Sequence, residues 1–92
     1  MVRLLIVEDE KKLRVLMSDF FKMKGYEVSE AENGIDATKI LQQQEFDMIF
    51  LDIMMPGMDG IEVCKKVRTQ TDVPILFLTA LYDEETKLKG YA

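Results

Sequence analysis

The chain has 92 residues, of which 48% are hydrophobic and 32% are charged, and its 17 acids and 12 bases give a formal net charge of −5. This length is that of one small domain, and this composition is typical of a globular protein rather than a disordered one. The acidic balance, without any run of Lys or Arg, argues against a nucleic-acid surface.

Missing residue types exclude further classes of chemistry. The chain has no histidine, so neither His-based catalysis nor His metal ligation is expected within it. The single cysteine, Cys64, cannot form an internal disulfide and favours a cytoplasmic location. No apolar run is long enough to cross a membrane, and the N-terminal apolar stretch is too short for a signal peptide.

Four segments have the sequence pattern of strands. Three are short apolar runs, typical of strands buried on both faces, and one alternates between apolar and polar residues, which suits a sheet edge. In chain order, these strands are expected at 3–7, 26–31 (the alternating one), 47–51 and 74–78.

A predicted helix follows each strand. In the first three, apolar residues recur at helical spacing. Their apolar positions are Leu13, Leu16, Met17, Phe20 and Phe21, then Ile35, Ala37, Ile40 and Leu41, then Ile61, Cys64 and Val67. Gly25 is the expected stop of the first helix, and Asp83 is the expected cap of the fourth. Four strand–helix units predict an open, doubly wound α/β sheet with parallel strands.

Oxygen-bearing side chains directly follow three of the predicted strands. Glu8 and Asp9 come after the first strand, Asp52 after the third and Thr79 after the fourth. Each has a simpler explanation alone: Asp9 as a helix cap, Glu8 as a solvated acid, Asp52 as a turn residue and Thr79 as a helix-entry residue. In open parallel sheets, however, ligands bind beyond the carboxyl ends of the strands, where these residues would meet.

Three carboxylates at one end of a buried sheet repel one another unless a cation lies among them. Oxygen ligands without His or Cys favour Mg²⁺. A magnesium ion beside a nucleophilic carboxylate and a hydroxyl is suited to phosphoryl transfer, so the pattern favours phospho-aspartate chemistry.

The stretches "LLIVEDE" (4–10), "LDIMMPGMDG" (51–60) and "PILFLTA" (74–80) resemble the receiver domain of two-component response regulators. The resemblance covers the whole chain, 1–92, as one domain. It implies a flavodoxin-like sheet of order 2-1-3-4 and a cytoplasmic phosphorelay domain that takes a phosphoryl group from a histidine kinase. Such a domain is a signalling switch rather than an enzyme, and binds neither nucleic acid nor membrane itself.

The resemblance also implies residue roles. Asp52 would be the phosphoacceptor, and Thr79 would contact the phosphoryl group and act in the switch. The Mg²⁺ ligands would come from Glu8, Asp9, Asp52 and the backbone carbonyl of Met54.

One departure from the family pattern qualifies these roles. The fifth strand, its lysine and the fifth helix are missing from the sequence, so we expect either that the chain is the ordered part of a longer protein or that a dimer or an exchange of elements covers the exposed apolar surface. The alternative is a receiver-like scaffold or dimerisation fragment that takes no phosphoryl group. A phosphatase of the haloacid-dehalogenase type is disfavoured, because Met54 stands where that class needs a second acid.

Overall fold

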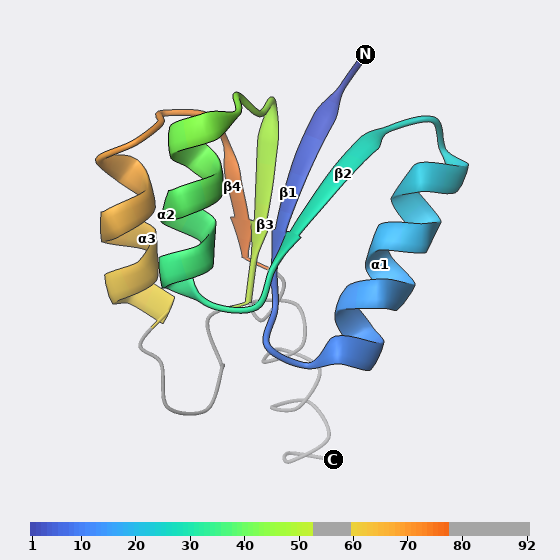
Figure 1. Ribbon diagram of the computed structural model, residues 1–92, viewed down its shortest axis with the longest axis horizontal. Helices are drawn as coiled ribbons and strands as arrows, with labels where there is room; N and C mark the ends of the chain where they lie inside the picture. Colours follow the sequence, from blue (N-terminus) through green and yellow to red (C-terminus); the bar gives the residue numbers. More distant parts are fainter. Residues whose placement is uncertain (53–59, 78–92) are drawn as a thin grey trace, which may run out of the picture.

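The computed structural model describes residues 1–52 and 60–77 of the chain, which form a parallel sheet with helices on both faces (Figure 1). The strands are β1 (Arg3–Val7), β2 (Glu27–Ala31), β3 (Met48–Leu51) and β4 (Ile75–Phe77). The helices are α1 (Lys11–Met23), α2 (Gly34–Gln43) and α3 (Gly60–Arg68). The predicted fourth helix lies outside the described residues.

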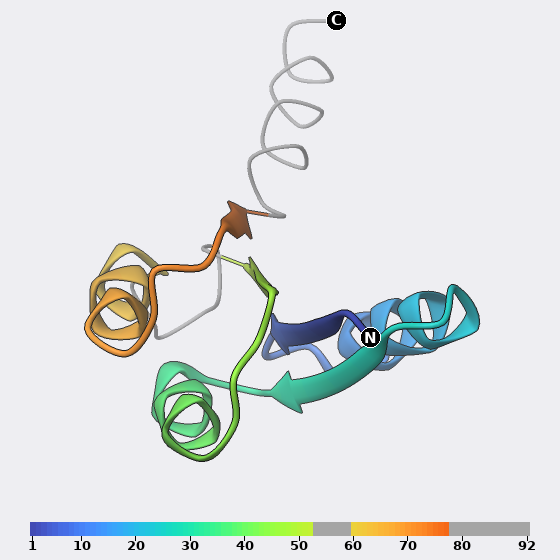
Figure 2. The ribbon, with the colours of Figure 1, turned by 90° about the horizontal axis from the view of Figure 1, so that it is seen from above.

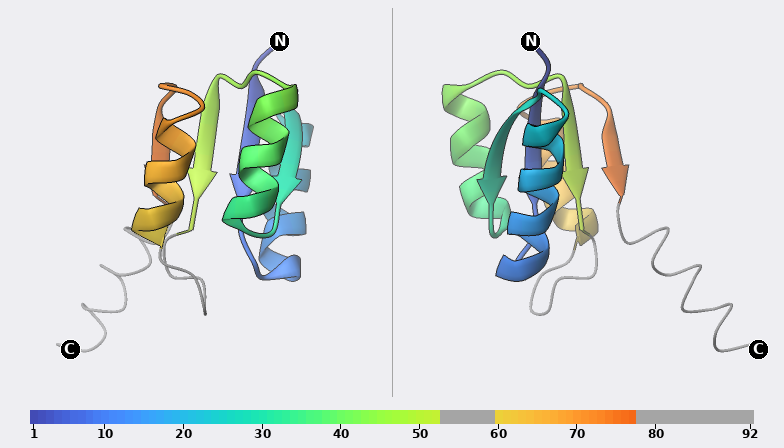
Figure 3. Two further views of the ribbon diagram at one scale, coloured as in Figure 1. Left: turned by 60° about the vertical axis from the view of Figure 1, so that its left-hand side comes forward. Right: turned by 90° about the vertical axis from the view of Figure 1, so that its right-hand side faces the viewer.

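The strand order is β2-β1-β3-β4, and every pairing is parallel, as the sequence predicted. All four strands therefore run toward the same edge (Figure 3). Helix α1 covers one face of the sheet, and α2 and α3 pack side by side on the other (Figure 2). Chain reversal after α1 occurs near Gly25, whose φ of 93° lies in the left-handed region that favours glycine.

The core is centred on β1 and β3. Strand β1 has helices on both faces, so its consecutive residues from Leu4 to Val7 are all buried. In the β1–β3 register, Leu5 lies opposite Ile49 and Val7 lies opposite Leu51. These side chains pack with Ala31, Ala37, Phe46, Val63 and Val67 in one hydrophobic cluster.

The helices bury only part of their predicted apolar faces. Ile35 and Ile61 remain 62% and 60% exposed, whereas Ala37 and Val63 are buried. On α3, the buried residues Val63 and Val67 are four positions apart, so they lie on the same side of the helix. The position of each helix over the sheet therefore decides which apolar residues are covered, and the sequence pattern alone does not.

The two strands at the edges of the described sheet differ in character. Strand β2 is at an edge, as its alternating pattern predicted, and most of it is half-buried. Strand β4 pairs, among the described residues, with β3 alone, and its residues Leu76 and Phe77 are exposed. The apolar edge expected at the fourth strand is therefore present within the described part of the chain. The expected dimer or element exchange stays a prediction.

Replacing Ile49 by Ala is expected to lower the free energy of unfolding by about 2–5 kcal/mol, because this β3 side chain is fully buried and its truncation leaves a cavity in the hydrophobic cluster. Ile35→Ala is the matched control, with an expected change within about 0.5 kcal/mol because this side chain is exposed. Urea unfolding of both variants measures the two effects. Equal losses would contradict the core described above.

Candidate functional site

The ends of β1 and β3 bring two acidic residues side by side. Each continues its strand's hydrogen-bond ladder by one residue: the Glu8 N–H donates to the Ala31 carbonyl at 3.0 Å, and the Asp52 N–H donates to the Val7 carbonyl at 3.1 Å. Because Val7 lies opposite Leu51, the next residues, Glu8 and Asp52, are neighbours at the carboxyl edge of the sheet. The strand register therefore sets this pair.

The structure confirms that Glu8, Asp9 and Asp52 come together. Each contributes a carboxylate oxygen to a cluster in which all three oxygens lie within 4.8 Å of one another. Their exposures differ, since Glu8 is buried, Asp52 is half-buried and Asp9 is exposed. The explanation of Glu8 as a solvated loop acid is therefore wrong.

The electrostatics of the cluster are dominated by Glu8, which is only 2% exposed. Its atom Oε2 is buried without a hydrogen-bond partner among the described residues. The pKa of Glu8 is raised from 4.5 to about 8, first by burial, and then by a hydrogen bond to Asp52 that its protonated form favours. The charges of Asp52 and Asp9 raise this pKa further, and a hydrogen bond from the Glu10 backbone opposes the shift.

This donor set fits a hard divalent cation. A buried carboxylate oxygen that lacks a partner needs either a proton or a cation, and two further carboxylates lie within reach of the same ion. Oxygen ligands alone match the preference of Mg²⁺, as the sequence indicated.

The remaining predicted site residues have separate outcomes. Thr79 and Met54 lie outside the described residues, so their roles stay predictions. The cap of α1 is Glu10 rather than Asp9, and Glu10 makes no side-chain capping hydrogen bond. The explanation of Asp9 as a helix cap is therefore wrong. Arg14 is a further residue near the site, which sequence reasoning did not single out because its contacts are made across the fold.

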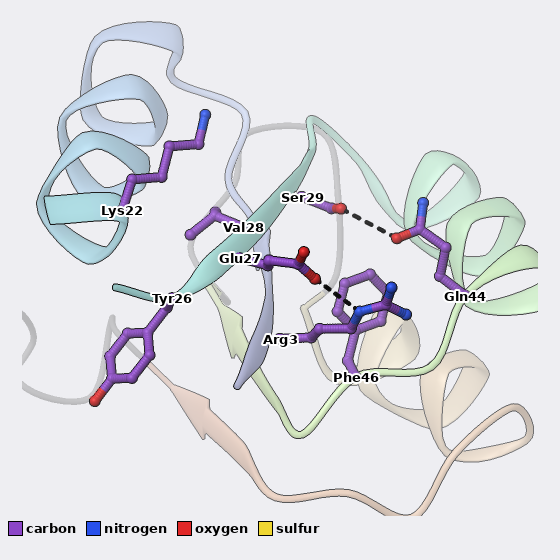
Figure 4. A pocket seen from close by; sticks show the side chains of 8 residues that line it. All are labelled: Arg3, Lys22, Tyr26, Glu27, Val28, Ser29, Gln44 and Phe46. Carbon is purple, nitrogen blue, oxygen red and sulfur yellow. Dashed lines mark hydrogen bonds and ion pairs between the residues drawn. The ribbon is translucent and has the colours of Figure 1, made fainter. Parts of the chain in front are cut away.

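A cavity of about 480 Å³ lies away from the carboxylates, where β1 and β2 begin (Figure 4). It is lined by Arg3, Lys22, Tyr26, Glu27, Val28, Ser29, Gln44 and Phe46. Within it, Arg3 Nε and Glu27 Oε2 form an ion pair at 2.9 Å. The carboxylate cluster and this cavity are thus separate features at opposite edges of the sheet.

The free energy of unfolding, measured without divalent cations, is expected to fall as the pH rises from about 4.5 to about 8. In this window, folded Glu8 keeps a proton that the unfolded chain releases, so the folded state binds more protons and loses stability with rising pH. One proton gives a slope of at most about 1.4 kcal/mol per pH unit. Urea unfolding at several pH values measures it.

Glu8→Gln is the control, because the amide does not titrate and the fall should flatten over the same window. An unchanged pH profile in Glu8→Gln would contradict the assignment of the shifted pKa to this residue.

Comparison with known proteins gives a consistent family match. The family model described as "Response regulator receiver domain" matches residues 4–92. The chain is 39% identical over 89 residues to the transcriptional regulatory protein ResD of Bacillus subtilis (strain 168), covering 97% of this chain and 37% of that protein. The chain therefore spans a little over a third of the length of this relative.

Solved structures match over most of the fold. The structure of histidine kinase ThkA in complex with response regulator protein TrrA matches with a TM-score of 0.73 at 39% identity, over 82% of this chain and 66% of that chain. TrrA from Thermotoga maritima in complex with Mg(2+)-BeF matches with a TM-score of 0.69 at 27% identity, over 100% of both chains. The order of the strands and the sequence thus lead to the same family.

Proposed function

The chain belongs to the family of response regulator receiver domains, and we propose that it is a phosphoacceptor whose Asp52 takes a phosphoryl group from a histidine kinase. The observation that carries this proposal is the cluster of Glu8, Asp9 and Asp52 at the carboxyl edge of the sheet. The complex of ThkA with TrrA supports a kinase as the partner. The Mg(2+)-BeF complex of TrrA supports Mg²⁺ as the cofactor.

The proposed ligands of Mg²⁺ are the carboxylates of Glu8, Asp9 and Asp52 and the backbone carbonyl of Met54. When bound, the ion neutralises negative charge on the phosphoryl oxygens. The buried Glu8 carboxyl would lose its proton as it becomes a ligand, since a protonated carboxyl is a poor ligand for a cation.

The proposed transfer needs only one nucleophile from this chain. A carboxylate oxygen of Asp52 attacks the phosphorus of the kinase phosphohistidine and forms an O–P bond. The N–P bond breaks, and its electron pair leaves with the imidazole, which becomes neutral or takes a proton from water. In this proposal the Thr79 hydroxyl donates a hydrogen bond to the transferred group.

The biological setting follows from this chemistry. Phosphorylation replaces the single negative charge of the Asp52 carboxylate with a phosphoryl group that carries about 1.5 to 2, and this change can shift the balance between two packings of the domain and so alter its affinity for a partner. Among the described residues, no helix is both long and apolar enough to cross a membrane. We place the domain in the cytoplasm, as a signalling module that meets its kinase there.

Exposure of the protein to acetyl phosphate and Mg²⁺ is expected to produce a phosphoryl adduct that intact-mass spectrometry detects. Asp52→Asn should abolish it, because the amide is a much weaker nucleophile than the carboxylate. Asp47→Asn is the matched control: Asp47 lies just before β3, at the other end of that strand, and accepts a hydrogen bond from the Arg3 backbone. An adduct that persists in Asp52→Asn would contradict the assignment.

The affinity for Mg²⁺ is expected to rise with pH between about 5 and 8, by up to about tenfold per unit. The reason is that Glu8, with its pKa raised to about 8, must release its proton before it can bind the ion. Isothermal titration calorimetry in buffers of different ionisation enthalpy measures both the affinity and the released proton. Proton release that is unchanged in Glu8→Gln would contradict this mechanism.

A further inference from the structure

We propose that Arg14 is a positioning residue that holds the segment 8–10 in the geometry required for Mg²⁺ binding, an inference that rests on the proposed function. Arg14 is in α1 and is not one of the clustered acids. It acts on them through the backbone between β1 and α1. A second arginine, Arg3, forms a similar ion pair away from the acidic site and serves as a control that separates this role from a general contribution to stability.

The Arg14 side chain connects the acidic site to β2. Its atom Nη1 donates a hydrogen bond to the Glu8 carbonyl oxygen at 2.9 Å. Its atom Nε pairs with Glu30 Oε1 at 3.2 Å. The side chain is only 13% exposed, so both contacts are shielded from water. The guanidinium is a rigid, planar group, and two acceptors on two of its nitrogens fix its orientation.

The backbone of Arg14 holds the other end of the same segment. Its N–H donates to the Glu10 carbonyl at 2.9 Å, in the first turn of α1. Arg14 therefore fixes the carbonyl groups of both Glu8 and Glu10, the two neighbours of Asp9. Because the Asp9 side chain is exposed, little packing restrains it, so the backbone on either side is the main restraint on where this residue lies.

Glu30 completes this arrangement from the neighbouring strand. It lies opposite Ile6 in the β1–β2 register, and the next residue, Ala31, accepts the hydrogen bond from the Glu8 N–H. Glu8 is thus tied to β2 twice, directly through its N–H and indirectly through Arg14 and Glu30. The carboxylate of Glu8 can therefore stay in its buried position beside Asp52 while the charge of Arg14 is compensated by Glu30.

The fold also contains a matched control. Arg3 and Glu27 form a second arginine–glutamate pair, with Nε and Oε2 2.9 Å apart. This pair joins β1 to β2 where both strands begin, at the end of the sheet opposite to the acidic cluster. Its side chains are 48% and 53% exposed. Both pairs end on a glutamate of β2. Arg3→Gln therefore removes an arginine–glutamate ion pair to the same strand without touching segment 8–10.

The test is the Mg²⁺ affinity of the folded protein, measured by isothermal titration calorimetry with MgCl₂. Arg14→Gln is expected to weaken Mg²⁺ binding by about tenfold or more, the usual effect of removing a group that orients metal ligands. Arg3→Gln should bind Mg²⁺ as the parent protein does. Urea unfolding of the same variants separates a loss of affinity from a loss of stability, because a merely structural role would change only the latter.

Arg14→Lys keeps the proposal testable if Arg14→Gln does not fold. Lysine keeps the positive charge and most of the aliphatic stem, but its single ammonium group does not reproduce the fixed fork of the guanidinium. Its Mg²⁺ affinity is therefore expected to remain below that of the parent.

The outcomes distinguish this inference from the function on which it rests. Parent-like Mg²⁺ affinity in a folded Arg14→Gln or Arg14→Lys variant would overturn the role of Arg14 and leave the proposed function standing. Equal losses in Arg14→Gln and Arg3→Gln would also overturn it. A parent protein that binds no Mg²⁺ would overturn the proposed function and this inference together.

Discussion

Burial of Glu8 beside Asp52 costs free energy, because a carboxylate that leaves water loses its hydration and here also meets a second acid. The two acids extend β1 and β3, and the backbone N–H of each donates to a neighbouring strand, so their backbone positions side by side are fixed by the sheet. The domain must therefore neutralise the pair where it stands. A proton on Glu8 does so in the free protein, and a divalent cation can do so when it is present.

The parallel topology brings the acids that follow β1 and β3 to the same end of the sheet. Strands of one direction deliver the residues that follow them to one edge, and β1 is paired directly with β3 in the observed order. The sequence was sufficient to predict this much. Apolar runs identified β1 and β3 as central strands, although the similar run of β4 lies at an edge of the described sheet with Leu76 and Phe77 exposed. The alternating run identified β2 as an edge strand, and the acids that follow the strands indicated the site. Each of these signals is local, or follows from a general rule of sheet topology.

Features that depend on contacts across the fold were not accessible in the same way. Nothing in the local pattern distinguishes Glu8 from Asp9, although one is buried and the other exposed. In the sequence, Arg14 looks like an ordinary polar residue of an amphipathic helix. Its proposed role depends on two hydrogen-bond acceptors, the Glu30 carboxylate and the Glu8 carbonyl, which only the fold brings next to it. Similarly, helical spacing predicts which residues share an apolar face but not which part of that face contacts the sheet. Ile35 of α2 is therefore exposed, whereas Ala37 is buried.

Protonation, metal binding and the proposed phosphorylation are coupled, because all three take place at the cluster of Glu8, Asp9 and Asp52. With its pKa near 8, Glu8 is largely protonated at neutral pH, so a metal that binds there must displace a proton and its affinity depends on pH. In the proposed reaction, phosphorylation turns the Asp52 carboxylate into a mixed carboxylic–phosphoric anhydride, whose phosphoryl group carries about 1.5 to 2 negative charges beside the same Glu8. That charge raises the demand for a cation and, without one, favours the protonated form of Glu8. The titration of Glu8 therefore belongs to the whole site rather than to one residue, and any change that moves segment 8–10 alters all three equilibria at once.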